Sequence, residues 1–597
     1  MNQQQSTAES SGAARDLRPW RREAGLYLGA LVACLLILCW IMRLWQADLR
    51  VPFVYSADTL LTAVAIRTTV DQGWYFSNPA LGAPSGLQFY DYPGADVFHF
   101  FVIKILSFFT RNFWLILNLH FLAGFALTTL TSLYVMRRAK VSAACALLGS
   151  LLYAFLPFHF MRGEAHLFLS FYAWVPVATM LALWIIDGSL ARPAPALIAH
   201  LKERKTGVLL ATLFCLVLAS SGLYYAFFAC FFFFLAGLYS SFARHNRFPF
   251  IVACFFIGVI LFGILLNVAP NLAYWSAQGK NPGAVVRNIG EVELYGLKIS
   301  QLVLPMSGHR SDFLSGLKGD YNAAMPMVNE NDTATLGLVG VIGFGILLLC
   351  LISKRVREFD ARLSQLSVLN IGALLLATIG GFSAVFNLVV GPYIRCYNRI
   401  SVYIAFFCLF AVVICLDKTL KNLPASSPLR RSFYLVPGIL LLVGLLDQTT
   451  PGFAPDYSGV QKQFFNDQRF VRRVEAAAPP DGMIFQLPFV EFPESPPMVK
   501  MTDYQHLRPY LHSKTTRWSY GAIKGRPGSR QQKQLARRPT PELVGELKAA
   551  GFCGIYINRD GYEDKGYELE SELGSLLGTY PVRSDDGSLL FFPFPKS

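Results

Sequence analysis

The stretch LYLGALVACLLILCWIMRLW, residues 26–45, is an apolar run long enough to cross a lipid bilayer as one helix. It is longer than the core of a signal peptide, and no small-residue cleavage site accompanies it. Similar runs recur through the first three quarters of the chain. Over all 597 residues, 53% are hydrophobic and 15% are charged. This composition excludes an ordinary soluble protein and predicts an α-helical polytopic membrane protein with a retained first helix.

The net charge of +15 raises the question of a nucleic-acid partner. Most basic residues, however, form short clusters between apolar runs, where the positive-inside rule expects them on the cytoplasmic side of a membrane. We therefore expect no nucleic acid among the partners. The clusters are Arg15, Arg18, Arg21 and Arg22, then RRAK at 137–140, KERK at 202–205, ARHNR at 243–247, KRVRE at 354–358, and Lys418, Lys421, Arg430 and Arg431.

All these clusters fall on one side of the membrane if the chain crosses it about eleven times. Residues 1–24 then form a cytoplasmic tail, and 25–449 form the transmembrane domain with outer loops at 46–112 and 270–333. Counting 95–109 as a further span would place RRAK outside, so we expect this segment to lie in the outer interface. The expected spans are 25–45, 113–136, 141–160, 167–187, 206–221, 223–242, 249–269, 334–353, 365–388, 399–416 and 433–449.

The composition changes beyond residue 450, where segments typical of strands, such as GMIFQLPF and CGIYINR, alternate with segments typical of helices, such as PELVGELKAAG. This pattern predicts a small C-terminal extracytoplasmic α/β domain over 450–597. Nine of the eleven cysteines lie in apolar runs, and none forms a Cys-x-x-Cys pair. We interpret them as buried apolar side chains rather than as zinc ligands or redox centres.

Ionisable residues gather at the outer ends of the expected spans, which indicates a polar cavity that opens outward, because such groups are costly near lipid. Asp58, Asp71, Asp91 and Asp96 lie in the first outer loop. Asp58 could instead cap the following helix, and Asp91 in YDYPG could be a turn residue before Pro93.

Two other outer turns carry charged groups. FHFMRGEAH, 158–166, holds Arg162, Glu164 and His166, which could form either a site or an interfacial salt-bridge cluster. Arg395 and Arg399 stand four residues apart, a spacing that suits phosphate oxygens or lipid headgroups.

Aromatic residues on the outer side are the candidates for contact with an acceptor. Tyr224 and Tyr225 could line a substrate site or sit at the interface as tyrosines often do. The stretch 504–526, which contains Arg517, Trp518 and Arg526, is rich in side chains that stack on and hydrogen-bond sugars. A packed strand and loop would explain the same stretch.

Several of these features together resemble the GT-C superfamily of integral membrane glycosyltransferases. They are a first helix followed by an outer loop with an early Asp, two juxtamembrane helices, the RR turn after the second span, and LLYAFLPFHFMRGEAH at 151–166. The chain is also similar to YfhO-like bacterial multi-span proteins. It departs from better-known GT-C members in having single acids, not adjacent pairs, in the first loop and at the 163–166 turn.

The GT-C resemblance implies transfer of a sugar from a polyprenyl-phosphate donor to a glycolipid, polysaccharide or protein acceptor at the outer face of a bacterial inner membrane. It implies Asp58 as the general base of an inverting reaction. By the same analogy, Arg162, Arg395 and Arg399 would bind the donor phosphate. Asp91, Glu164 and His166 would be candidates to hold Mg²⁺ or Mn²⁺, and the acceptor-binding candidates would be Tyr224, Tyr225, Arg517, Trp518 and Arg526.

Two other functions compete with this interpretation. A flippase or exporter of lipid-linked sugar would share the membrane architecture, although transporters often show inverted repeats and broken helices at mid-membrane. A non-catalytic assembly factor of the cell envelope would use the outer domain to present a polymer. A scaffold would tolerate loss of the Asp58 carboxylate, whereas a transferase would not.

Overall fold

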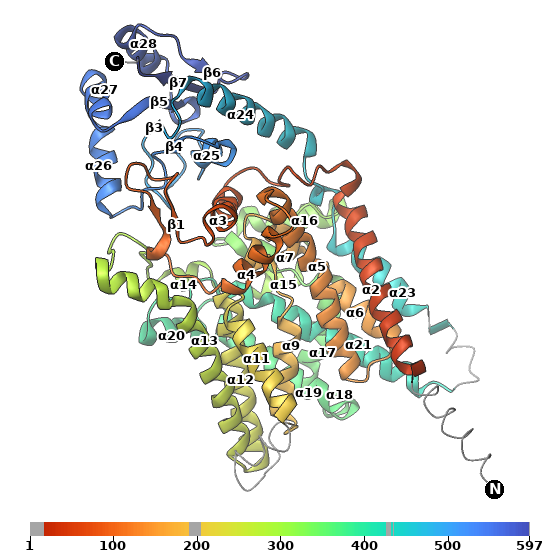
Figure 1. The fold of residues 1–597 in the computed structure, drawn as a ribbon. Helices are drawn as coiled ribbons and strands as arrows, with labels where there is room; N and C mark the ends of the chain where they lie inside the picture. The colour runs from red at the N-terminus through yellow and green to blue at the C-terminus, as the bar shows by residue number, and fades with distance from the viewer. Residues whose placement is uncertain (1–16, 190–204, 425–431, 434, 596–597) are drawn as a thin grey trace, which may run out of the picture.

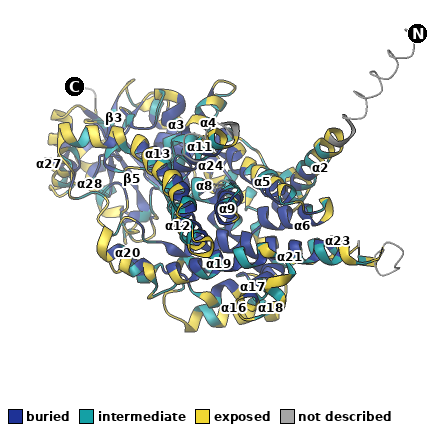
Figure 2. Cartoon of the chain, turned by 90° about the horizontal axis from the view of Figure 1, so that it is seen from below, coloured by how far each residue is buried: buried dark blue, intermediate teal, exposed yellow. Residues whose placement is uncertain are grey.

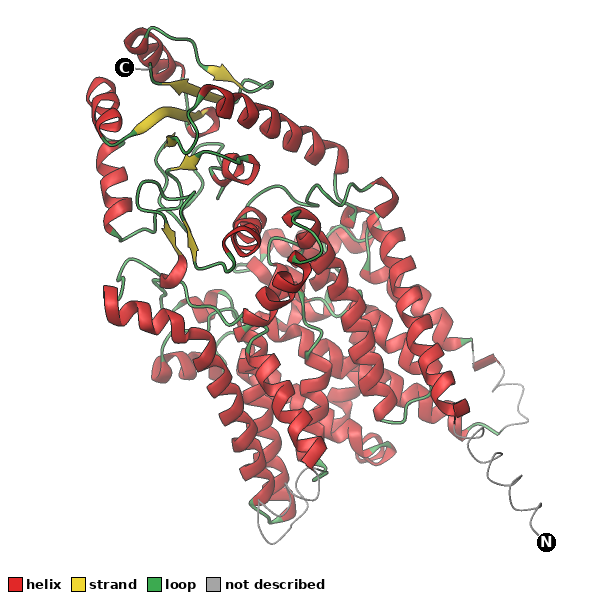
Figure 3. Cartoon of the chain, in the orientation of Figure 1, coloured by secondary structure: helices red, strands yellow, loops and turns green. Residues whose placement is uncertain are grey.

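The computed structural model describes residues 17–189, 205–424, 432–433 and 435–595. Arg15, residues 202–204, Arg430 and Arg431 of the expected basic clusters lie outside these ranges. A bundle of helices forms one part of the molecule, and a smaller part with a sheet stands at one end of the bundle (Figures 1 and 3). The strands are confined to that end (Figure 3).

Six helical segments among the described residues are long and apolar enough to cross a membrane, which confirms a multi-pass membrane protein. A seventh span would result if α23 and the helical segment Pro451–Ala477 after it, which meet at an angle of 65°, are counted as one. The six are α2 (Leu17–Met42), α5 (Phe113–Arg138), α6 with α7 (Ala143–Ala154, Pro157–Arg162), α12 (Leu223–Arg244), α13 (Phe248–Gln278) and η4 with α21 (Tyr397–Ile400, Ser401–Asn422).

The other five expected spans also contain apolar helices, but these are shorter, so the count of eleven crossings stays a prediction. They are α9 (Val175–Ile186), α11 (Lys205–Ala219), α17 (Gly337–Ile352), α19 (Ala361–Ala377) and α23 (Val436–Gln448). Short helices flank some of them, namely α8 (Leu167–Ser170), α18 (Lys354–Phe359) and α20 (Phe382–Val390).

Helix α21 lies at the centre of the bundle, where it packs against α6, α9, α17 and α19. Buried residues gather around α9 and α21, while α13 and α20 carry many exposed ones (Figure 2). Close packing requires a glycine at Gly343, because a Cβ there would come within 2.0 Å of the Cys408 carbonyl oxygen on α21. Small residues of this kind let the backbones of membrane helices approach.

The outer connections hold short helices and one small hairpin. In the first outer loop, two helices, α3 (Asp58–Gln72) and α4 (Val97–Ser107), flank a hairpin and a short helix. These are β1 (Ser77–Asn78), β2 (Leu87–Gln88) and η2 (Phe89–Asp91). At 11 residues α4 is too short to span a bilayer, as we expected for 95–109. The second outer loop contains α14 (Glu291–Leu294), α15 (Ile299–Val303), α16 (Asp312–Ala324) and η3 (Asn329–Ala334).

The C-terminal part contains a mixed five-stranded sheet in the order β4-β3-β5-β7-β6. Strand β3 runs parallel to β4 and β5, whereas β7 runs antiparallel to β5 and β6. The elements are α24 (Tyr457–Ala477), β3 (Met483–Leu487), α25 (Leu507–His512), β4 (Arg517–Trp518), α26 (Pro527–Leu535), α27 (Thr540–Ala549), β5 (Phe552–Asn558), α28 (Tyr567–Leu577), β6 (Val582–Arg583) and β7 (Leu589–Pro593).

One face of this sheet shares its hydrophobic core with the first outer loop and with the outer ends of α2 and α5. A second, smaller core on α27 and α28 covers the other face. The domain boundary at residue 450 stays a prediction. The structure adds that the C-terminal part and the first outer loop are packed as one unit.

A buried ion pair fastens this unit to the end of α13. Asp91 receives two hydrogen bonds from Arg526, at 2.8 and 2.7 Å, and further ones from Asn281 at 3.0 Å and Trp275 at 3.2 Å. Burial raises the pKa of the Asp91 carboxyl, but these hydrogen bonds, with that of Arg526 the largest, outweigh it and lower the pKa overall. Asp91 and Arg526, expected in separate roles, therefore bind each other.

Arg526→Gln removes one partner of this pair and leaves the Asp91 charge buried. We expect a loss of about 3 kcal/mol of stability in the purified protein, at the lower end for a broken buried pair because Arg526 is partly exposed. Arg517→Gln is the matched control, because Arg517 donates only to the carbonyls of Pro79 and Pro84. Equal losses in the two variants, measured by denaturant unfolding in detergent, would contradict this assignment.

Candidate functional site

Asp58 stands at the outer end of the bundle as the first residue of α3. The residue preceding the helix is Ala57, which has a φ of 47° and makes no side-chain cap, so the interpretation of Asp58 as the N-cap is wrong. The Asp58 carboxylate keeps 45% of its surface exposed and lies 3.8 Å from Nε2 of His166. This separation is too long for a hydrogen bond.

The surroundings of Asp58 disfavour its charged form. Burial raises its pKa to about 6, and the negative charges of Asp503 and Glu494 add to the rise, while Arg399 opposes it. The carboxylate is therefore only partly accessible to water. Asp503 and Glu494 come from the C-terminal part, and no pattern in the sequence linked them to Asp58.

His166 is neutral beside Asp58. Burial lowers the pKa of its imidazole to about 4, and the charges of Arg162 and Arg399 lower it further. The contact with Asp58 is therefore not an ion pair at neutral pH. A neutral imidazole can donate one hydrogen bond and accept another.

Two of the three expected phosphate-binding arginines meet at one carboxylate. Arg399 binds Glu330 through two hydrogen bonds of 3.1 and 2.9 Å, and Arg162 lies 3.0 Å from the same carboxylate. Burial raises the pKa of Glu330, but the charges of Arg399 and Arg162 outweigh it and lower the pKa to about 2. Two cations thus share one anion, which leaves one positive charge uncompensated within this trio.

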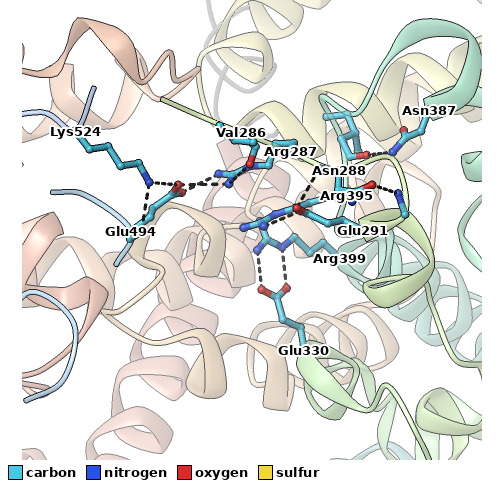
Figure 4. Close-up of polar contacts among 12 residues, drawn as sticks. Val286, Arg287, Asn288, Glu291, Glu330, Asn387, Arg395, Arg399, Glu494 and Lys524 are labelled. Carbon is cyan, nitrogen blue, oxygen red and sulfur yellow. Dashed lines mark hydrogen bonds and ion pairs between the residues drawn. The ribbon is translucent and has the colours of Figure 1, made fainter. Parts of the chain in front are cut away.

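Arg395, between α20 and η4, belongs to a neighbouring group of ion pairs around the second outer loop (Figure 4). It binds Glu291 at 2.9 Å. In the same region Arg287 binds Glu494 at 2.8 Å, and Lys524 lies 3.7 Å from Glu494. This group of ion pairs connects the second outer loop with the C-terminal part, and its acids were not identified from the sequence.

A cavity of about 410 Å³ adjoins His166 and Arg399. Thr62, one helical turn beyond Asp58, lines it, as do Tyr224 and Asp96. Arg399 lies over the Tyr224 ring, 4.4 Å from its centre. The rest of the wall is mainly apolar and includes Leu223 on α12 and Ile264 and Val268 on α13, two helices that can span a membrane. The cavity therefore joins a charged end to an apolar wall.

The segment before Asp58 is fixed from three sides. Glu164, 1% exposed, accepts a hydrogen bond of 3.0 Å from the Val54 amide, and Asn118 on α5 donates to the carbonyls of Leu49 and Val51. Burial raises the pKa of Glu164 to about 8, so its carboxyl is mostly protonated at neutral pH. Glu164 therefore acts here as an uncharged anchor for the segment.

Tyr55 provides the third anchor, which comes from the C-terminal part. Its hydroxyl donates to Asp467 at 3.1 Å and lies 2.8 Å from Nε2 of His512, and its carbonyl accepts a hydrogen bond of 2.8 Å from Arg508. The Arg508 guanidinium also covers the Tyr55 ring at 4.7 Å. The C-terminal part thus determines where the chain enters α3 and where Asp58 stands.

The expected metal ligands do not come together. Asp91 is occupied by Arg526, Glu164 by the Val54 amide, and His166 faces Asp58. Across the described ranges, no group of three or more His, Cys, Asp or Glu side chains is arranged to hold a metal ion. These residues do not fit a shared divalent cation, so no chemical step is assigned to one.

Most of the expected acceptor-binding residues have structural positions. Trp518 is fully buried in the core that the sheet shares with the first outer loop, where it cannot contact an acceptor. Arg517 donates to loop carbonyls at 3.2 and 3.0 Å, and Arg526 is held by Asp91. Tyr225 lines the cavity, although it is almost fully buried and its hydroxyl donates to the Leu169 carbonyl. Tyr224 lines the cavity as well, together with Arg399 and His166.

Fold and site together define a multi-pass membrane protein with a partly charged cavity at the end of the bundle that carries the C-terminal part. No family model and no curated protein matches the chain. Among solved structures it is similar to the oligosaccharyltransferase AglB from Archaeoglobus fulgidus in complex with an inhibitory peptide and a dolichol-phosphate. The identity is 12% and the TM-score 0.46, over 96% of this chain and 74% of that one.

The same archaeal enzyme tethered with an acceptor peptide gives 11% identity and a TM-score of 0.47, with coverage of 96% and 74%. The arabinofuranosyltransferase AftD from Mycobacteria gives 14% identity and a TM-score of 0.39, over 89% of this chain and 36% of that one. Both names are those of enzymes that transfer sugars.

Tyr55→Phe removes the hydroxyl that ties the Asp58-bearing segment to the C-terminal part. We expect faster amide exchange at Val54 and its neighbours, by about tenfold, because one net hydrogen bond contributes about 1 kcal/mol or more when its partners are buried. Hydrogen–deuterium exchange of the peptide that carries residues 51–57 measures this.

Tyr510→Phe is the matched control. The Tyr510 hydroxyl accepts a hydrogen bond from the Asn78 side chain at the same interface and does not contact residues 51–57. Unchanged protection of the segment in Tyr55→Phe would show that the other anchors suffice.

Proposed function

We propose that this protein is a membrane glycosyltransferase that moves a sugar from a polyprenyl-phosphate donor to a hydroxyl acceptor at the outer face of the membrane. The observation that carries the proposal is the position of Asp58. A carboxylate with a pKa of about 6 stands 3.8 Å from His166, which lines a cavity with the Arg399 guanidinium at one end and mainly apolar walls. A general base works best when its pKa lies near the working pH.

The cavity suits the two chemical parts of such a donor. Leu223, Ile264 and Val268 offer an apolar wall for the first isoprenoid units. Arg399, with Arg162 behind it, offers the positive charge that the trio with Glu330 leaves uncompensated, and a phosphate group would compensate it. Arg395, bound to Glu291, would add to the positive field without direct contact.

The reaction follows from the order of these groups. Asp58 accepts the proton of the acceptor hydroxyl while that oxygen forms a bond to the anomeric carbon of the donor. The bond from this carbon to the phosphate oxygen breaks on the opposite face, which inverts the configuration, and the phosphate leaves with the electron pair. Arg399 and Arg162 stabilise the negative charge on the leaving phosphate.

The position of the acceptor follows from the same geometry. Asp503, Glu494 and Tyr504 approach Asp58 from the C-terminal part, as their mutual effects on pKa indicate. We propose that the acceptor enters between Asp58 and this part. With the basic clusters inside, this face is extracytoplasmic and the N-terminus is cytoplasmic. The GT-C resemblance implies that the membrane is a bacterial inner membrane.

The first test is sugar transfer from a panel of radiolabelled polyprenyl-phosphate sugars into membrane glycoconjugates. We expect transfer by the wild type and a loss of at least about 100-fold in Asp58→Asn, because general-base help is typically worth about 10² to 10⁴ in rate. Asp71→Asn is the matched control, since Asp71 lies on the same helix and pairs with Arg67. Absence of transfer from every donor by folded wild-type protein would favour a flippase or a scaffold.

The pH dependence of transfer tests the role of Asp58 separately. The base must be unprotonated, so the rate should fall about tenfold per pH unit below a pH of about 6 and be level above it until other groups titrate. An aspartate with an ordinary pKa would place this fall near pH 3.8. His166, with a pKa of about 4, does not titrate in this window.

Asp96 has a pKa of about 6 as well, so the profile is repeated with Asp96→Asn. The fall should remain in that variant. Its disappearance would assign the titration to Asp96 and remove the support for Asp58 as the base.

A further inference from the structure

Asp96 is a carboxylate in the wall of the cavity that the proposed reaction does not use. It precedes α4, but its side chain makes no cap of that helix. Within the described part of the chain, this carboxylate makes no hydrogen bond and no ion pair. Burial raises the pKa of the Asp96 carboxyl to about 6.

An unpaired carboxylate in such a place requires a physical reason. The neighbouring wall of the cavity contains Leu167, Phe168 and Leu223, which cannot solvate a charge. Burying a charge without a partner is costly, and ionisable groups at membrane depth usually serve binding or transport. The helix cap, which is the simplest structural role for an aspartate at this position, is excluded by the geometry of α4.

We propose that Asp96 binds hydroxyl groups of the donor sugar, and that the cavity selects a neutral, polyhydroxylated sugar over a negatively charged one. This inference rests on the proposed function. A carboxylate can accept hydrogen bonds from two neighbouring hydroxyls at once, whereas it repels a uronate or a second phosphate.

The layout of the cavity supports this assignment. Arg399 and Asp96 both line it, and Arg399 pairs with Glu330 and forms no ion pair with Asp96 among the described residues, so the two groups occupy separate places on the wall. A phosphate at Arg399 would leave the attached sugar to extend along the wall toward Asp96. The volume of about 410 Å³ lies within the range of about 300–1,000 Å³ that small-molecule sites have.

Donors that each lack one hydroxyl of the transferred sugar provide the test. With the wild type, we expect removal of the hydroxyl that faces Asp96 to lower kcat/KM by about 10- to 100-fold, as for a lost hydrogen bond to a charged group. With Asp96→Ala, the intact donor should lose a similar factor and the deoxy donor almost nothing, so that the discrimination disappears. Asp96→Asn, which keeps the shape, should accept a uronic acid donor better than the wild type does.

Asp71→Asn serves again as the control and should discriminate as the wild type does. Transfer that persists in the Asp96 variants with unchanged discrimination overturns this inference and leaves the proposed function intact. If no single hydroxyl matters to the wild type by more than about threefold, the inference is also overturned, whether or not the variants fold. Absence of transfer from any donor overturns the proposed function and this inference together.

Discussion

Backbone pairing between the first outer loop and strand β4 is the interaction on which the site depends. The Trp518 amide donates to the Ala80 carbonyl at 2.9 Å, the Ala83 amide to the Trp518 carbonyl at 3.0 Å, and the Gly82 amide to the Tyr520 carbonyl at 2.9 Å. The loop thereby continues the edge of the sheet. Gly82 has a φ of 68°, and a Cβ there would lie 3.0 Å from the Ala522 amide nitrogen, so this approach requires glycine.

This pairing brings two distant parts of the chain to the same space. The C-terminal part is held against the loop that leads into α3, and Tyr55 and Arg508 then fix the entry to that helix. Because Asp503 and Glu494 arrive with the C-terminal part, the carboxylate of Asp58 is partly shielded from water and meets other negative charges. Both effects disfavour its ionised form, and they prepare it to accept a proton near neutral pH.

The charges around the cavity are arranged by sign. Arg162 and Arg399 meet at Glu330 with one positive charge in excess, which suits a phosphate. The Asp96 carboxylate lies elsewhere on the wall of the cavity, and the Asp58 carboxylate lies 3.8 Å from His166, which also lines it. The apolar wall on α12 and α13 links this polar region to the membrane, so a lipid-linked substrate could reach it without leaving the bilayer.

Sequence reasoning singled out Asp58, His166 and Arg399, because each stands in a turn or loop near an apolar run. The structure brings them into one region, and their roles stay predictions. It also placed Asp91 and Arg526 in separate roles, although they form one buried ion pair. Trp518 was expected to contact an acceptor because exposed and buried tryptophans look alike in a single sequence. Glu330 and Asp503 were missed because a carboxylate in a loop gives no sign of a partner that lies tens or hundreds of residues away.

The sequence by itself determined that the chain is a multi-pass membrane protein with a sheet-containing C-terminal part. Hydropathy and strand or helix patterns are local properties, so they can be interpreted window by window. The tertiary structure alone decided which acids and bases meet, which of them lose contact with water, and where the cavity opens. These features depend on packing between segments as distant as Tyr55 and Asp467, and local patterns carry no record of that packing.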